Sequence, residues 1–328
     1  MTPRNVLVTG GSNGIGRAVV RLFASKGDTV WFTYHSGRAR ADDLLAECRR
    51  SGWDRVAAFA FRQGDRDSHE RLLAALPGPV DVLVNNAAVG SKTVERYEPD
   101  PARRDEAFFR INSVGPLWLI RQLVPGMVER EYGKVVNVSS VGGGISQFPG
   151  FHVADGMSKA ALAYLTRHLA AELAHTPVDI TAVCPGAVET PMFEASTLAS
   201  LAPDERRAFA ARLPKGRLIH PEEMAEVVWW LAGDGSRVLH GAVVDASMGL
   251  GVHPGLLTGR AAEGPDSRAA DGPYGASTDG PYGGPGVGGP YGPDAARTEG
   301  PDADGPYGSG AAARGAAAGR GADPAGGL

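Results

Sequence analysis

Two side chains that can exchange a proton, Asp155 and Lys159, stand four residues apart in the segment His-Val-Ala-Asp-Gly-Met-Ser-Lys-Ala-Ala-Leu at residues 152–162. On a helix this spacing places both on one face, one turn apart. A carboxylate and an ammonium group at that distance shift each other's pKa and can bind or transfer a proton. An ordinary aspartate is protonated in only about one molecule in a thousand at pH 7. The pair therefore predicts proton chemistry that depends on the surroundings of Asp155.

A glycine-rich turn at residues 10–16, Gly-Gly-Ser-Asn-Gly-Ile-Gly, is the second feature that suggests chemistry. It follows an apolar stretch, Asn5–Thr9, that is typical of a strand, and it precedes a helical pattern over Arg17–Lys26. Glycines allow the backbone to approach a pyrophosphate, and the N-terminus of a helix that opens near Gly14 favours the negative charge. The turn predicts a dinucleotide site, although glycine turns after strands are common.

The elements that must position these residues alternate along the chain between apolar strands and helical patterns. The predicted strands cover residues 5–9, 29–34, 56–61, 81–85, 134–139, 178–184 and 242–245. The predicted helices cover residues 17–26, 38–51, 68–76, 101–130, 155–175 and 221–232. Continuous apolar strands in strict alternation with helices predict an α/β fold, a doubly wound, Rossmann-like parallel sheet covered on both faces.

Composition divides the chain near residue 254. Residues 1–253 have ordinary apolar content and are predicted to form one dinucleotide-binding domain, which is large enough for a stable core. Residues 254–328 consist mainly of Gly, Ala, Pro, Asp and Arg and repeat the sequence Gly-Pro-Tyr-Gly four times. This tail contains too few aliphatic side chains to offset the entropy of ordering, so we expect it to be disordered.

Charge and cysteine content exclude several classes of protein. The tail carries five arginines and nine acidic residues, and the preceding 253 residues carry 28 basic and 28 acidic ones. That balance argues against a nucleic-acid surface. The chain shows no signal peptide and no apolar run of the roughly 20 residues that span a bilayer. Its two cysteines suggest no disulfide framework. We expect a cytoplasmic protein with a small-molecule substrate and no membrane partner.

Five motifs together resemble the short-chain dehydrogenase/reductase family, single-domain type, over residues 4 to about 250. They are Thr-Gly-x-x-x-Gly-x-Gly at the glycine turn, Asn-Asn-Ala-Ala at residues 85–88, Asn112, Ser139-Ser140, and Pro185-Gly186 leading to Thr190. The resemblance implies an NAD(P)-dependent oxidoreductase, and we expect it to act as a reductase. It also implies a homodimer or homotetramer that pairs through two long helices.

The resemblance assigns roles to single residues. Asn112 matches an asparagine that holds a water beside the catalytic lysine, Ser140 a serine that hydrogen-bonds substrate, and Lys159 a lysine that binds the nicotinamide ribose. Asp65 matches an adenine contact, with a helix cap as an equally weighted alternative. No metal ligands are implied. The residues expected around the cofactor are Gly10, Ser12, Asn13, Gly14, Ile15, Gly16, Asp65, Asn86, Ala87, Lys159, Pro185, Gly186 and Thr190.

The choice of cofactor follows from charge at the end of the second predicted strand. An acidic residue there would bind the ribose 2′-hydroxyl of NADH and repel a 2′-phosphate. This chain has Thr-Tyr-His-Ser at residues 33–36 and then Arg38 and Arg40. Hydroxyl and guanidinium groups bind phosphate well, so Ser36 and Arg38 predict NADPH in preference to NADH. The alternative is that the arginines, Arg40 in particular, only solvate the next helix.

Two departures from the family pattern concern the predicted active site. Asp155 stands where the family has its catalytic tyrosine, four residues before Lys159. Ser140 precedes Asp155 by 15 residues, about two more than the usual spacing. The extra residues fall in the glycine-rich stretch 142–150, which is expected to move the serine or to open the pocket.

Three hypotheses remain open for the function. The first is an NADPH-dependent reductase of an iminium, imine or hemiaminal carbon in a bulky small molecule, such as a secondary metabolite. Hydride addition to such a carbon yields a neutral amine, so the reaction depends less on an acid. The second is a carbonyl/alcohol oxidoreductase with another proton donor, and the third is a non-catalytic NADP-binding protein. Substrate contacts are predicted for His152, Met192 and Phe193, the last two in a lid at residues 187–216.

Overall fold

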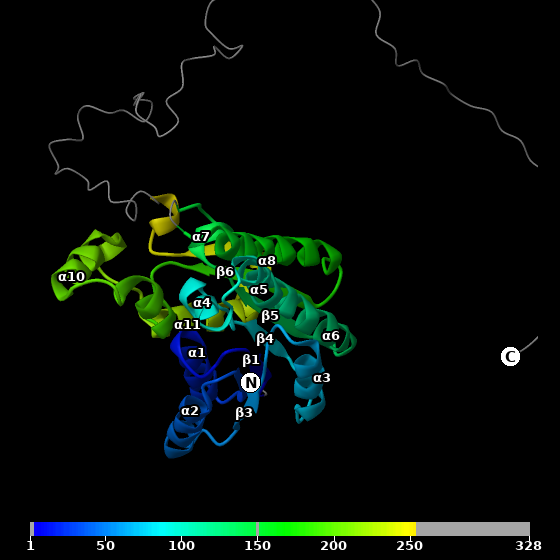
Figure 1. Cartoon of the computed structure of the whole chain (residues 1–328). Helices are drawn as coiled ribbons and strands as arrows, with labels where there is room; N and C mark the ends of the chain where they lie inside the picture. The colour runs from blue at the N-terminus through cyan, green and yellow to red at the C-terminus, as the bar shows by residue number, and fades with distance from the viewer. Residues whose placement is uncertain (1–2, 149–150, 254–328) are drawn as a thin grey trace, which may run out of the picture. The chain divides into compact units, whose positions relative to one another are not determined.

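The computed structural model describes residues 3–148 and 151–253, and the predicted tail at 254–328 lies outside this range. Seven parallel strands form one sheet in the order β3-β2-β1-β4-β5-β6-β7 (Figure 1). Their bounds are β1 Asn5–Val8, β2 Thr29–Tyr34, β3 Val56–Ala60, β4 Val82–Asn85, β5 Gly133–Val138, β6 Val178–Pro185 and β7 Val243–Ala246. The doubly wound α/β fold predicted from the alternation is therefore confirmed.

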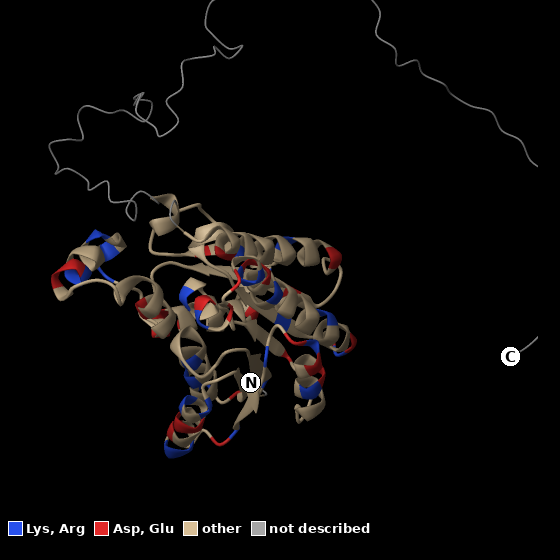
Figure 2. Ribbon diagram, viewed as in Figure 1, with Lys and Arg blue, Asp and Glu red and all other residues tan. Residues whose placement is uncertain are grey.

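Helices cover both faces of the sheet. The longer ones are α1 Gly14–Ser25, α2 Arg38–Arg50, α3 Arg66–Ala75, α5 Pro101–Phe109, α6 Gly115–Glu129, α8 Val153–Glu172, α10 Pro203–Arg212 and α11 Pro221–Leu231. The short ones are α4 Ser91–Tyr97, α7 Val141–Gly144 and α9 Pro191–Phe193. In the view of Figure 2, acidic and basic residues are interspersed over these helices.

The side-chain alternation of the strands divides the core into two clusters. Val6 and Val8 of β1 pack with α1, α2 and α11 on one face, whereas Leu7 packs with α3, α6 and α8 on the other. Successive side chains of a strand point to opposite faces, and both faces here are apolar. This explains why the strands read as continuous apolar runs rather than alternating ones.

Several helical features differ from the prediction, and helices α7, α9 and α10 were not among those expected. The single helix expected over residues 101–130 consists of α5, a π-helical turn η1 at Arg110–Val114, and α6. Turns of this kind occur inside α-helices and frequently lie at functional sites, and this one contains Asn112. Helix α4 was not expected, because its seven residues are too few to show a helical period.

Among the described residues, no helix combines the length and apolar character that a bilayer span requires. The same part of the chain contains no group of three or more His, Cys, Asp or Glu side chains placed to hold a metal ion.

Candidate active site

The glycine-rich turn is held in place by the segment that follows β4. The Nδ2 of Asn86 donates hydrogen bonds to the backbone carbonyls of Thr9 (2.9 Å) and Gly10 (3.2 Å). In return, the Thr9 hydroxyl accepts hydrogen bonds from the backbone N–H groups of Asn86 and Ala87. Both predicted cofactor residues therefore lie directly against the turn. The ends of β1 and β4 meet here, where the strand order reverses and where such sheets bind their ligands.

Three positions of the turn require glycine, because a side chain would strain the backbone or clash with it. Gly10 and Gly14 have φ angles of +68° and +50°, a region that costs other residues about 1–2 kcal/mol. A Cβ at Gly16 would lie 2.3 Å from the carbonyl oxygen of Gly10. Ser12 is buried in the turn, and the Asn13 side chain does not cap α1. The first N–H groups of α1 have no partner within the helix. The glycine turn and these N–H groups together fit the negatively charged diphosphate of a dinucleotide.

The other half of the predicted cofactor site comes from the end of β6. Pro185 closes that strand and Gly186 follows it. The Thr190 side chain lies 3.1 Å from the position that a Cβ at Gly14 would occupy, and Ile15 packs against the core beside α11. The structure thus brings the β1 turn and the β6 segment together around Gly14.

A substitution at the turn tests its role. Gly16→Ala is expected to weaken dinucleotide binding by at least about tenfold, because moving the Gly10 carbonyl displaces the backbone that meets the phosphates. Isothermal titration calorimetry would measure the change. Gly235→Ala is the matched control, since a Cβ there meets nothing within 4 Å. Unchanged binding by the Gly16 variant would show that the turn does not hold the cofactor.

The two arginines that follow β2 have different surroundings. Arg38 is exposed, and its Nε lies 3.4 Å from the Asp42 carboxylate. Arg40 folds back instead, so that a Cβ at Gly37 would lie 2.7 Å from its Nη2 and 3.1 Å from the Ser12 hydroxyl. The Arg40 guanidinium therefore lies close to Ser12 of the glycine turn, while the residue as a whole is exposed to solvent.

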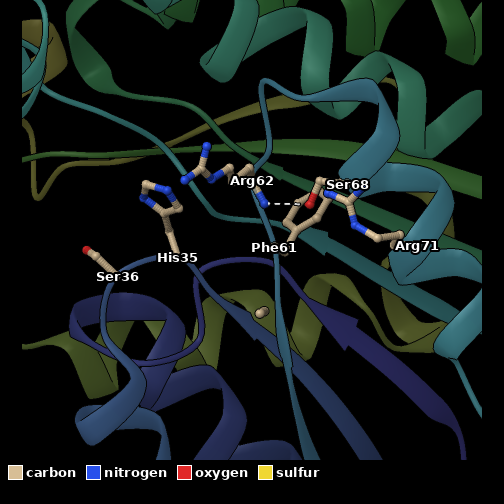
Figure 3. A pocket seen from close by; sticks show the side chains of 7 residues that line it. His35, Ser36, Phe61, Arg62, Ser68 and Arg71 are labelled. Atoms are coloured by element: carbon tan, nitrogen blue, oxygen red, sulfur yellow. Dashed lines mark hydrogen bonds between the residues drawn. The ribbon is translucent and has the colours of Figure 1, made fainter.

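A cavity of about 420 Å³ lies beyond Ser36, at the carboxyl ends of β2 and β3 (Figure 3). Its lining consists of His35, Ser36, Ala60, Phe61, Arg62, Ser68 and Arg71. Asp65, predicted to contact adenine, is not part of this lining. It instead caps α3 by accepting a hydrogen bond from the backbone N–H of Asp67 (3.1 Å), which is the alternative given for it. Arg62 was not among the site residues predicted from the sequence. Its position directly after a predicted strand, where ligands bind in such sheets, could have indicated it.

Asp155 and Lys159 lie in the first two turns of α8 and are each only 8% exposed. Burial raises the pKa of Asp155, and the positive charges of Lys159 and His152 partly offset this rise. Burial lowers the pKa of Lys159, while the charge of Asp155 acts in the opposite direction. The neighbouring Cys184 stays a neutral thiol, because burial raises its pKa to about 11. The site therefore holds one buried acid and one buried base, each pushed towards its neutral form.

Asn112 joins the π-helical turn to α8. Its Nδ2 donates hydrogen bonds to the Ser158 hydroxyl (3.0 Å) and the Val89 carbonyl (3.1 Å), and its Oδ1 accepts one from the Val89 N–H (2.9 Å). The Ser158 hydroxyl in turn donates to the backbone carbonyl of Asp155 (2.7 Å). The Asn112 side chain thus fixes the first turn of α8, and with it the position of Asp155.

The glycine-rich stretch after Ser140 folds back onto α8. The Ser140 hydroxyl accepts a hydrogen bond from the Gly142 N–H (3.2 Å), and the Ser139 hydroxyl donates to the Lys159 carbonyl (2.9 Å). A Cβ at Gly143, where φ is +99°, would lie 2.1 Å from the carbonyl oxygen of Gly156. The described residues of this stretch pack against the helix that carries Asp155, and the expected displacement of Ser140 or opening of the pocket stays a prediction.

The three predicted substrate contacts do not form one cluster. His152 directly precedes α8 without a capping hydrogen bond from its side chain. It lines a second cavity of about 540 Å³ with Asp105, Phe109, Phe151, Val153, Ala154 and Met157. Its Nε2 lies 3.9 Å from the Asp105 carboxylate. Met192 is 43% exposed and lies against Gly90, after β4. Phe193 packs on Phe209 of α10, with ring centroids 6.0 Å apart, and therefore contributes to packing within the lid.

Comparison with known proteins identifies the family to which the chain belongs. A family model described as short chain dehydrogenase matches residues 4–200. The acetoacetyl-CoA reductase of Allochromatium vinosum is 32% identical over 254 residues, covering 76% of this chain and 99% of the relative. The 3-oxoacyl-acyl-carrier-protein reductase of Thermotoga maritima is 34% identical over 249 residues, covering 74% and 96%.

Solved structures of reductases are also similar to this chain. An actinorhodin polyketide ketoreductase crystallised with NADPH is 31% identical, has a TM-score of 0.68 and covers 76% of this chain and 97% of its own. Levodione reductase is 27% identical, with a TM-score of 0.69. The chain therefore belongs to the short-chain dehydrogenase/reductase family and is an NAD(P)-dependent oxidoreductase.

Proposed function

We propose that the protein is an NADPH-dependent reductase that delivers hydride to an iminium, imine or hemiaminal carbon of a bulky small molecule. The observation that supports this proposal is the carboxyl group of Asp155, buried one helical turn from Lys159. The proposal takes Asp155 to stand where the family has its tyrosine. The predicted roles of Asn112, Ser140 and Lys159 are part of the proposal.

Each residue has a task that its surroundings permit. When bound, the nicotinamide supplies the hydride. Lys159 binds the ribose that carries it, and Ser140 donates a hydrogen bond to the substrate. Asn112 holds α8 through Ser158, which keeps Asp155 and Lys159 at a constant separation. A site that is rigid before the substrate arrives needs no reorganisation during the reaction.

A carboxylate suits a cationic electrophile. Ionised Asp155 stabilises a C=N⁺ carbon relative to its neutral imine or hemiaminal precursor, and Coulomb attraction is strong in a buried site. Hydride addition to this carbon gives an amine without simultaneous protonation. The same carboxylate slightly opposes the addition, because the positive charge disappears in that step. The advantage therefore lies in the population of the reactive cation.

Reduction of a ketone is the second candidate, and the raised pKa of Asp155 favours it. A ketone becomes an alkoxide that must receive a proton in or near the transition state. Because burial is the largest influence on Asp155, its protonated fraction at neutral pH exceeds that of an exposed aspartate. The relatives named above are also reductases of oxoacyl compounds. Their activities count against the third hypothesis, a non-catalytic NADP-binding protein.

A matched substrate panel separates the two reactions. NADPH oxidation would be followed at 340 nm with cyclic imines and with ketones of the same ring and substituents. The proposal predicts turnover of the imines and little turnover of the ketones. The opposite result would establish carbonyl reduction. NADPH binding without turnover of either set would contradict both enzymatic proposals.

The pH dependence gives an independent test. If ionised Asp155 stabilises a cation, kcat/KM falls as the pH drops through the raised pKa of this residue. If protonated Asp155 is the acid, kcat/KM falls as the pH rises through the same pKa. The two profiles therefore have opposite slopes over the range in which Asp155 titrates.

The preference for NADPH over NADH, a homodimer or homotetramer, and a cytoplasmic location belong to the same proposal. The arginines and hydroxyls after β2 support the first of these. Val153, Met157 and Tyr164 support the second, because they form an exposed, largely apolar stripe along α8. Their spacing of four and seven residues places them on one face of the helix.

A further inference from the structure

The cavity at the ends of β2 and β3 has a positively charged lining. Arg62, Arg71 and His35 contribute cationic or titratable side chains, Ser36 and Ser68 contribute hydroxyls, and no carboxylate is among the residues that line it. Its volume of about 420 Å³ lies within the range of about 300–1,000 Å³ that is typical of small-molecule sites. Such a lining suits a phosphate group.

The backbone of Arg62, two residues after the end of β3, is held by hydrogen bonds. The N–H of the preceding residue, Phe61, donates to the Tyr34 carbonyl (2.8 Å) and continues the pairing of β3 with β2. The N–H of Arg62 itself donates to the Ser68 hydroxyl (2.9 Å), which joins it to α3. Phe61 is almost fully buried. The backbone of Arg62 is therefore fixed on both sides, and Figure 3 shows its side chain extending over the strand ends near His35.

Among the described residues, Arg62, unlike Arg38 and Arg71, has no acidic side chain close to its guanidinium group. Arg38 lies 3.4 Å from the Asp42 carboxylate and Arg71 lies 3.7 Å from that of Asp65. Within residues 3–148 and 151–253, no carboxylate lies within 4 Å of the Arg62 guanidinium. A guanidinium that has no such partner can donate two parallel N–H hydrogen bonds to a phosphate.

The position of the cavity identifies the phosphate. The glycine turn after β1 meets the diphosphate of the dinucleotide, and the end of β2 meets the adenosine ribose at its 2′ position. β3 is paired with β2 in parallel, with Tyr34 beside Ala60. The residues two positions further along, Ser36 and Arg62, therefore leave neighbouring strands at the same edge. This places the Arg62 cavity beside the ribose rather than beside the diphosphate.

We infer that Arg62 recognises the 2′-phosphate of NADPH, with Arg71 adding positive charge and Ser36 and Ser68 adding hydroxyl groups to the same cavity. The inference rests on the proposed use of NADPH and adds a residue at the end of β3 to those at the end of β2. A bidentate, charge-assisted contact of this kind discriminates between two ligands that differ only in the phosphate.

Calorimetric titration with NADP⁺ and NAD⁺ tests this role without any turnover. Arg62→Gln is expected to weaken NADP⁺ binding roughly 10- to 100-fold, as for the loss of a bidentate charged contact. Its affinity for NAD⁺ should change by less than about threefold. Arg62→Lys, which keeps the charge but not the fork, should give an intermediate loss. Arg66→Gln is the matched control, because Arg66 is exposed on α3 and faces Glu70 (3.7 Å).

The outcomes separate this inference from the proposal on which it rests. Equal losses for NADP⁺ and NAD⁺, or no loss for NADP⁺, would overturn the role of Arg62 and leave the NADPH preference intact. Loss of selectivity in Arg38→Gln, with Arg62→Gln unchanged, would also overturn it and assign the role to Arg38. Wild-type protein that binds both dinucleotides equally would contradict the NADPH preference itself. Binding of 2′,5′-ADP no tighter than 5′-ADP would then also overturn the role of Arg62. Thermal unfolding of each variant, measured alongside, would confirm that a loss of affinity does not come from misfolding.

Discussion

Asp155→Asn is expected to lower kcat by roughly 10²- to 10⁴-fold, the range that a positioned acid or base contributes. The affinity for NADP⁺ should stay within about threefold of wild type, because no role in cofactor binding is proposed for this carboxyl. Asparagine keeps the size of the side chain and removes both its charge and its acidic proton. The variant can therefore neither stabilise a C=N⁺ cation by its charge nor donate a proton. Stopped-flow measurement of NADPH oxidation, together with calorimetric NADP⁺ binding, would check both parts.

Two further variants at the same position separate these mechanisms. Asp155→Glu keeps a carboxyl group and should retain more activity than asparagine, although its longer chain displaces the charge. Asp155→Tyr introduces the residue type that the resemblance to the family leads us to expect at this position, and it should raise the ratio of ketone to imine turnover. A rate that is unchanged in Asp155→Asn would remove Asp155 from the mechanism.

Gly143→Ala is expected to destabilise the fold by about 2–5 kcal/mol, from a strained backbone conformation and a steric clash together. The φ angle of Gly143 is +99°, and its Cβ would lie 2.1 Å from the carbonyl oxygen of Gly156. Relief of that clash requires the segment after Ser140 to move away from α8. Since small displacements of a positioning group can cost up to about 10²-fold in rate, kcat should fall about 10- to 100-fold. Urea unfolding and steady-state kinetics would measure the two effects.

Gly156→Ala is the matched control, because it lies on the other side of the same contact. A Cβ at Gly156 meets nothing within 4 Å, and alanine in a helix is about 0.5–1 kcal/mol more stable than glycine. This variant should therefore be as stable as wild type or more stable. A Gly143 variant with wild-type stability would show that the segment does not rest on α8.

Much of the site was accessible from residue types and spacing. The Asn86 side chain binds the glycine turn, and Asp155 and Lys159 lie one turn apart in α8, as their spacing of four predicted. Other features were hidden because they depend on contacts between segments far apart in the chain. The π-helical turn at Asn112 has no distinct periodicity over five residues, and the cap formed by Asp65 was indistinguishable from a ligand contact.

The sequence by itself determined the order of strands and helices, the glycine-rich turn after β1, and the spacing of four residues between Asp155 and Lys159. These features are local, because they follow from the side-chain period, from glycine's freedom of conformation and from residue identity. Only the tertiary structure decided that Asp155 is buried, that Gly143 rests on α8, and that Arg62 rather than Asp65 lines the cavity beside β2. Burial and desolvation depend on all neighbouring segments at once, and they determine the pKa of Asp155 and therefore its chemistry.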